Sequence, residues 1–197
     1  MSVSLWVLLG VGLAVFFWGV GAYNRLVRLK NAIANAFGQI DVQLKRRYDL
    51  IPNLVEVARK YLAHESQTLE AVIAARNQAR TAEQTAATSP LNAGALGALA
   101  GAEQLLGGAL GRLFAVAEAY PDLKADQNMR ELSEELSSTE NRIGFARQAY
   151  NDNVLEFNDA AAQFPTLIVA RLFNFVPQGM LESTTSEAER QTLRIEI

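Results

Sequence analysis

The pattern of hydrophobic and polar positions changes at Tyr23. Before it, Leu5 to Val20 is apolar throughout, and no charged side chain precedes Arg25. After it, apolar positions recur every three or four residues, which is typical of amphipathic α-helices that pack against a partner. The pattern therefore predicts an apolar N-terminal segment followed by a helical domain.

The N-terminal segment has the length of a transmembrane helix. As an α-helix, residues 5–23 would span about 28 Å, close to the ~30 Å hydrocarbon core of a bilayer. Trp18 and Tyr23 lie toward its end, where amphipathic rings favour the headgroup layer. A cleaved signal peptide is the alternative, but such peptides begin with basic residues and have a shorter apolar stretch, whereas residues 1–4 contain neither Lys nor Arg. We therefore expect a retained membrane anchor.

Basic residues follow the anchor directly, at Arg25, Arg28 and Lys30. Because positive charges accumulate on the cytoplasmic side, residues 1–4 are expected outside and the chain from residue 24 onward inside. The three side chains can also contact anionic lipid headgroups. The alternative is a solvated basic turn that acts only on topology.

The first amphipathic segment runs from Leu26 to Leu62. Its apolar positions keep the same phase on both sides of Pro52, so the pattern predicts one continuous helix that is kinked at the proline. A break, with Asp49 capping a new helix, is the alternative. A corner follows at residues 64–66, where Ser66 is a candidate N-cap.

Three further helices are predicted, at residues 66–87, 91–120 and 126–163. The last of them and residues 24–62 would both span roughly 57–59 Å. Two long helices of matching length with two shorter ones between them predict an all-α fold, in which the transmembrane helix continues into a long antiparallel four-helix bundle.

In that topology the fourth helix returns to the membrane. It would bring the apolar segment 164–176 to the membrane surface. Leu167, Phe173 and Phe175 are then expected either to lie in the interface or to belong to a short helix that caps the base of the bundle.

The third predicted helix is rich in Gly and Ala. Each interior glycine costs a helix about 1 kcal/mol relative to alanine, so this helix needs neighbours. Gly97 and Gly101, like Gly107 and Gly111, are four residues apart. That spacing lets a second helix approach closely, at least inside membranes, so these glycines are predicted close-packing positions.

The chain is therefore divided into residues 1–4 outside the membrane, 5–23 in the membrane, 24–176 as the bundle and 177–197 as a tail. Near its end Leu193, Ile195 and Ile197 alternate with charged residues, which is strand periodicity. Because a lone strand buries nothing, a disordered tail is the alternative we favour.

Composition excludes most chemistry that a sequence can reveal. The chain has no cysteine and a single histidine, which rules out thiolate metal sites, cysteine nucleophiles and multi-histidine metal centres. A triad built on His64 and Ser66 would lack a nucleophile elbow, and no phosphate-binding glycine pattern occurs. The formal charge of −3 argues against nucleic-acid binding. We expect a non-enzymatic protein with neither cofactor nor metal.

Polar residues concentrate in two blocks, one on the first bundle helix and its corner and one on the fourth helix. We interpret them as cross-links that fix the register of the long helices. A docking surface for a partner is the alternative. The residues are Arg46, Arg47, Asp49, Asn53, His64 and Glu65 in the first block, and Glu140, Arg147 and Asn151 in the second.

These blocks resemble the bacterial LemA family. The matching motifs are YNRLV at 23–27, IDVQLKRRYDLIPNLVEVARKYLAHE at 40–65 and AYPDLKADQNMRELSEELSSTENRIGFARQAYN at 119–151, closed by Phe164-Pro165. The Gly/Ala region, the anchor and the tail carry no comparable signature. The resemblance implies a membrane helix and a helical-bundle domain. It also implies a link to magnetosome membranes in one branch and to envelope stress or membrane proteases in others, and it supplies no catalytic residues.

Together these patterns predict a single-pass protein of the bacterial inner membrane. The leading hypothesis is a scaffold whose cytoplasmic bundle self-assembles into a homo-oligomer and organises or shapes the membrane, with lipids as its other partners. The alternative is an adaptor that serves a membrane protease or an envelope-stress signalling protein.

Overall fold

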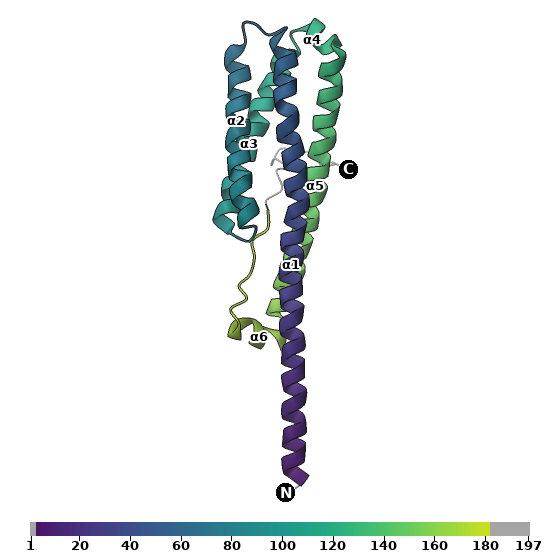
Figure 1. Cartoon of the computed structure of the whole chain (residues 1–197), viewed down its shortest axis with the longest axis vertical. Helices are drawn as coiled ribbons and strands as arrows, with labels where there is room; N and C mark the ends of the chain where they lie inside the picture. The colour runs from purple at the N-terminus through teal and green to yellow at the C-terminus, as the bar shows by residue number, and fades with distance from the viewer. Residues whose placement is uncertain (1–2, 182–197) are drawn as a thin grey trace, which may run out of the picture.

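The computed structural model describes residues 3–181, and every regular element in that range is an α-helix. The longest helix forms the axis of the molecule, and its N-terminal part projects alone below the other elements (Figure 1). The predicted all-α class with a long apolar N-terminal helix is confirmed. The helices are α1 (Val3–Arg59), α2 (Ser66–Thr88), α3 (Ala93–Ala117), α4 (Pro121–Ala125), α5 (Gln127–Ala162) and α6 (Thr166–Leu172).

The long helices lie side by side above the projecting part. α5 packs along α1, while α2 and α3 pack on each other and α2 also contacts α1 (Figure 1). The apolar stripe predicted for α1 forms the core of this contact, since Ile33, Phe37 and Ile40 are at most 2% exposed. On α5, Ile143 and Val154 are fully buried in the same way.

α1 runs through Pro52 without a break, so the alternative in which Asp49 caps a new helix is wrong. Proline has no N–H, which leaves the carbonyl four residues earlier, that of Tyr48, without its helical donor. Arg76 of α2 takes this place, because its Nε donates to the Tyr48 carbonyl oxygen at 2.9 Å. A hydrogen bond lost inside α1 is thus replaced by one between α1 and α2.

Side-chain caps set two of the helix starts. Asn92 accepts a hydrogen bond from the Ala95 N–H, and Asp126 accepts one from the Met129 N–H. α2 differs from the prediction. Ser66 is its first helical residue and not its N-cap, which is Glu65 without a side-chain cap bond.

Asp126 also ties the upper end of the molecule together. Besides capping α5, it accepts a hydrogen bond from the Tyr61 hydroxyl at 3.0 Å. The Met129 N–H first, and this hydroxyl second, hold the pKa of Asp126 below its usual range. α4 was not predicted. Pro121, which directly follows the helix predicted at residues 91–120, begins this single helical turn.

α2 and α3 do not extend as far as the lower end of α5. The Tyr150 hydroxyl donates to the Pro90 carbonyl, which places the α2–α3 turn beside the middle of α5. Below this level α1 and α5 continue as a pair that ends at α6 (Figure 1). The strand periodicity at residues 193–197, and most of the predicted tail, lie outside the described residues.

Candidate functional site

The N-terminal part of α1 exposes an apolar surface. Val7, Leu8, Phe16 and Phe17 are 59–70% exposed. The most apolar 18-residue window of α1 has a mean hydropathy of 1.8, and none of it is buried. Among the described residues, α1 is the one helix long and apolar enough to cross a membrane, so it is a candidate membrane span.

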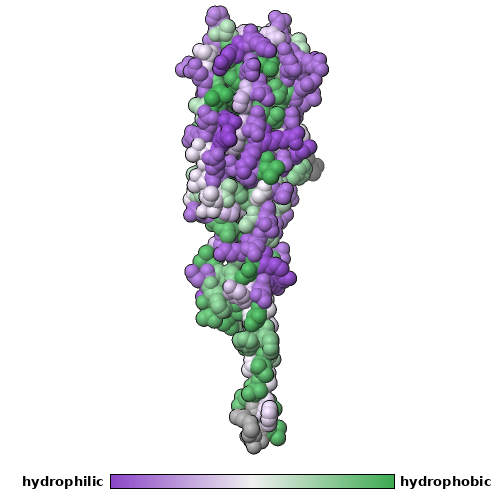
Figure 2. Space-filling view, in the orientation of Figure 1, coloured by the Kyte–Doolittle hydropathy of each residue, from purple (hydrophilic) through white to green (hydrophobic). Residues whose placement is uncertain are grey.

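α6 forms a second apolar surface where this projecting part ends. Val169 and Ala170 pack into the base of the molecule, while neighbouring apolar side chains point outward. We call the outward side chains the apolar foot: Phe164 (81% exposed), Ile168 (58%), Leu172 (75%), Phe173 (55%) and Val176 (54%). Figure 2 shows apolar surface at the height of α6 that continues into the projecting part of α1.

Aromatic contacts fix α6 to α1. The Tyr23 ring centroid lies 4.8 Å from that of Phe173 and 5.6 Å from that of Phe175, and Phe157 of α5 also packs on Phe175. Asn174 makes this possible by adopting φ 54°, so that the Phe175 N–H reaches back to the Ala170 carbonyl at 2.9 Å. This left-handed cap turns the chain back onto the molecule after α6.

The residues predicted for the membrane interface therefore come together. Tyr23, Phe173 and Phe175 form the aromatic cluster, and Trp18 is 41% exposed about one turn below it on α1. Leu167 is half-buried on α6. In the next turns of α1 the predicted basic residues Arg25, Arg28 and Lys30 are exposed. α6 adds an exposed Arg171.

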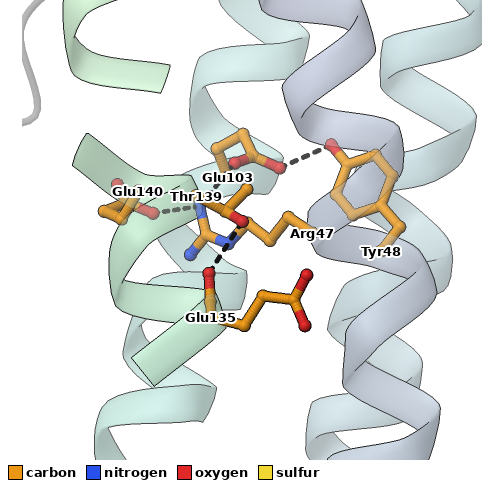
Figure 3. A network of polar contacts seen from close by, with 6 residues as sticks. All are labelled: Arg47, Tyr48, Glu103, Glu135, Thr139 and Glu140. Atoms are coloured by element: carbon orange, nitrogen blue, oxygen red, sulfur yellow. Dashed lines mark hydrogen bonds and ion pairs between the residues drawn. The ribbon is translucent and has the colours of Figure 1, made fainter. Parts of the chain in front are cut away.

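A polar network lies between the helices of the body (Figure 3). Arg47 of α1 is 7% exposed, and its Nη1 lies 2.9 Å from Glu103 Oε2 on α3 and 2.8 Å from Glu140 Oε2 on α5. The Tyr48 hydroxyl donates to Glu103 Oε1 at 2.6 Å. Burial, and then the Glu103 carboxylate, raise the pKa of Tyr48 above its usual value, so this hydroxyl stays protonated. The network ties three helices together.

Glu103 was missed in the sequence because its Gly/Ala-rich surroundings contain no polar cluster. A usable signal was present: Glu103 occupies a core position in the stripe formed by Leu99, Leu106 and Leu110. An acid at such a position needs a buried cationic or hydrogen-bonding partner.

A second buried acid, Glu83 of α2, was also missed, because its sequence neighbours are largely polar and give no sign that it is buried. It is 1% exposed, and neither of its carboxyl oxygens has a hydrogen bond. Lys45 Nζ lies 3.7 Å away and forms its shorter contact, 2.6 Å, with Asp41. Burial, followed by the neighbouring Asp41 carboxylate, raises the pKa of Glu83 to about 7.

The other predicted polar residues lie in several places. Arg46 binds Glu135 of α5, with its Nε 3.2 Å from the carboxylate. Asp49 is exposed, 3.9 Å from Arg76, and His64 is exposed in the α1–α2 turn beside Glu65. Asn53 lines an open groove of about 380 Å³ between α1 and α5 near their upper ends. Arg147 lies on α5.

The last predicted residue, Asn151, binds backbone instead of another helix. Its side chain pairs with the main chain of Leu181, in the segment after α6. Asn158 pairs with Gln178 in the same way. Within the described residues, no group of three or more acidic or histidine side chains is arranged to hold a metal ion.

Comparison with known proteins agrees with the motifs. The model of the LemA family matches residues 36–196. Protein LemA of Metamycoplasma hominis is 29% identical over 186 residues, which cover 94% of this chain and 79% of that protein. Magnetosome protein MamQ of Magnetospirillum gryphiswaldense is 25% identical over 168 residues, 78% of this chain but only 62% of that protein. Magnetosome protein MamQ 2 of Paramagnetospirillum magneticum is 26% identical with the same coverage. With the family model matching most of its length, this chain belongs to the LemA family.

Proposed function

We propose that this protein is a non-enzymatic, single-pass scaffold of the bacterial inner membrane. In this proposal α1 spans the bilayer with its N-terminus outside, and α1, α2, α3 and α5 form an antiparallel bundle in the cytoplasm. The observation that carries it is that two apolar surfaces meet at one level: the exposed span of α1 ends at Tyr23, where the apolar foot begins. Exposed Arg25 and Arg28 follow at once, as expected at a cytoplasmic headgroup layer.

The apolar foot would then lie in the same leaflet from which α1 emerges. Its exposed aromatic and aliphatic side chains are costly in water and favourable among acyl chains. Insertion at α6 as well as α1 would hold the bundle in one orientation on the membrane. The likeness to relatives named magnetosome proteins supports a role in membrane organisation.

We further propose that copies associate through the outer face of α3. Gly97, Gly101, Gly107 and Gly111 are exposed, and a Cβ added at any of them would meet nothing within 4 Å. Within residues 3–181, therefore, no helix approaches these glycines, and the close packing predicted for them would be supplied by another molecule. Leu105 is 56% exposed on the same helix. The helix has two charged residues, Glu103, which is buried, and Arg112, which is exposed.

The test is the size of the full-length protein in mild detergent, measured by light scattering. We expect an oligomer for the native chain and a smaller species when the four glycines are replaced by leucine. Replacement by alanine is the matched control, which keeps the face small and strengthens the helix. Helix content should not fall in either variant, because a Cβ added at any of the four positions meets nothing within 4 Å. A native chain that stays monomeric at all concentrations would contradict self-assembly.

The adaptor is a second candidate function. The groove between α1 and α5 lies at the end farthest from the proposed membrane, and three glutamates, Glu56, Glu131 and Glu135, line it. A client that docks there would be captured in a fixed ratio with the native protein. It would be lost when Glu131 and Glu135 are changed to lysine.

A further inference from the structure

The chain after α6 covers the lower part of the α1–α5 pair. We call residues 175–181 the tail segment. The turn that joins α2 and α3 lies beside Tyr150. Below that level the tail segment lies on α5, between Asn158 and Asn151. Leu181 is 7% exposed, whereas Val176 and Met180 are more than half exposed. Only part of this segment is therefore held by packing.

Two asparagines of α5 hold the segment through its backbone. Asn151 Oδ1 accepts the Leu181 N–H, and its Nδ2 donates to the Leu181 carbonyl, both at 2.9 Å. Asn158 makes the same pair of bonds with Gln178, at 2.8 and 2.9 Å. Each amide side chain thus satisfies both backbone groups of one residue and makes no use of that residue's side chain.

The spacing of the two asparagines matches an extended chain. They are seven residues apart, which is about 10.5 Å along an α-helix. Gln178 and Leu181 are three residues apart, which is about 9–10 Å in an extended chain. A chain with three residues per turn also presents every third residue to the same side. The face of α5 therefore fits extended peptide backbone in general, with an apolar side chain at the Leu181 position.

We propose that this face of α5 is a peptide-binding site and that the tail segment is its resident ligand. The ligand class is an extended peptide with free N–H groups at two positions three residues apart and a bulky apolar residue at the second. This site is independent of the scaffold function proposed above. A peptide from another molecule must compete with the tail segment, which is tethered a few residues from α6 and so has a high effective concentration.

The experiment uses the full-length protein in nanodiscs and a fluorescent synthetic peptide of residues 176–181, with binding followed by anisotropy. Gln178→Pro with Leu181→Pro removes both N–H groups by which the resident segment is held, and leaves α5 intact. We expect this variant to bind the peptide at least about tenfold more tightly than the native chain. Adding Asn151→Ala and Asn158→Ala should weaken that binding at least about tenfold.

Two controls make the result specific. Asn153→Ala removes an asparagine of α5 whose side chain binds its own helix at Ala149, and should leave peptide binding unchanged. A peptide with proline at both paired positions should not bind, which separates the site from adsorption to lipid. The proposal is overturned if the proline variant of the protein does not bind the native peptide, or if binding survives loss of Asn151 and Asn158 with helix content intact.

Discussion

At the scale of single residues, Arg47 lies among α1, α3 and α5 with a carboxylate on each of the other two helices. The two ion pairs differ in burial, since the side chain of Glu103 is 3% exposed and that of Glu140 is 47% exposed. Removing the buried partner of a buried charge is far more destabilising than removing an exposed one. The pair therefore offers a test of the network with its own control.

Glu103→Ala should lower the free energy of unfolding by about 3 kcal/mol, because it leaves Arg47 and Tyr48 without their buried acceptor. Glu140→Ala, which removes the solvent-facing partner of the same arginine, should cost less than about 1 kcal/mol. Urea denaturation followed by circular dichroism measures both. Equal costs for the two variants would show that burial does not set the strength of this network.

Glu83 makes the stability depend on pH. Its pKa rises from an ordinary value of 4.5 to about 7, first through burial and then through Asp41. Folding therefore favours the protonated acid, whose contribution is complete below pH 4.5 and is lost as the pH rises through about 7. We expect the Tm to fall between pH 5 and pH 8, and Glu83→Gln to flatten this dependence. An unchanged slope in the variant would rule out Glu83 as the titrating group.

At the scale of elements, the position of Pro52 sets how α2 docks on α1. The carbonyl that the proline leaves without a donor, that of Tyr48, is the one that Arg76 binds. The helix continues because the surrounding apolar stripe, with Ile51 and Leu54 fully buried, holds it on both sides of the proline. A residue that normally interrupts a helix acts here as a docking point between helices.

A double-mutant cycle tests this docking point. Arg76→Met keeps most of the side-chain stem but leaves the Tyr48 carbonyl without a donor, and should cost about 1–2 kcal/mol. In a Pro52→Ala background the new N–H of residue 52 can take that carbonyl, so the cost of Arg76→Met should shrink by at least about 0.5 kcal/mol. Strictly additive costs would mean that the proline and the arginine are not coupled.

At the scale of the whole molecule, the apolar foot and the exposed span of α1 define a membrane level. The chain has no cysteine, so a single introduced cysteine can carry an environment-sensitive fluorophore. In lipid vesicles, a probe at Ile168→Cys should report an apolar environment and be quenched by spin-labelled lipids. A probe at Phe145→Cys, a more exposed site of α5 more than four turns above its lower end, should not. If the probes at both sites report a water-exposed environment, α6 does not insert into the membrane.

Much of the fold follows from the sequence because it depends on short-range patterns. The period of apolar positions predicted α5 to within one residue at each end, and Asp126 marks its start through its own cap. Continuity of α1 through Pro52 followed from the unchanged phase. The N-cap of α2 was assigned to the wrong residue, since Ser66 is the first helical residue and Glu65 precedes it as the N-cap.

The candidate site was harder to predict. Tyr23, Phe173 and Phe175 were identified by their place at the ends of apolar segments, and they do meet. Glu83 and Glu103 were not, because a single acid in an apolar stripe gives no sign of its partner. Asn151 was identified as a polar helix residue, but its partner is the backbone of Leu181. Because nearly every residue carries the same backbone groups, the sequence does not show which of them a side chain binds.

The sequence by itself determined that this protein is helical, roughly where its long helices lie, and that one of them has the length and composition to span a membrane. These properties follow from periodicity and hydrophobicity within windows of a few turns. Only the tertiary structure decided which buried charges pair and where the chain goes after α6. Arg47 and Glu103 are 56 residues apart, and Asn151 and Leu181 are 30 apart. Contacts over such separations arise from how complete helices pack, so no local pattern encodes them.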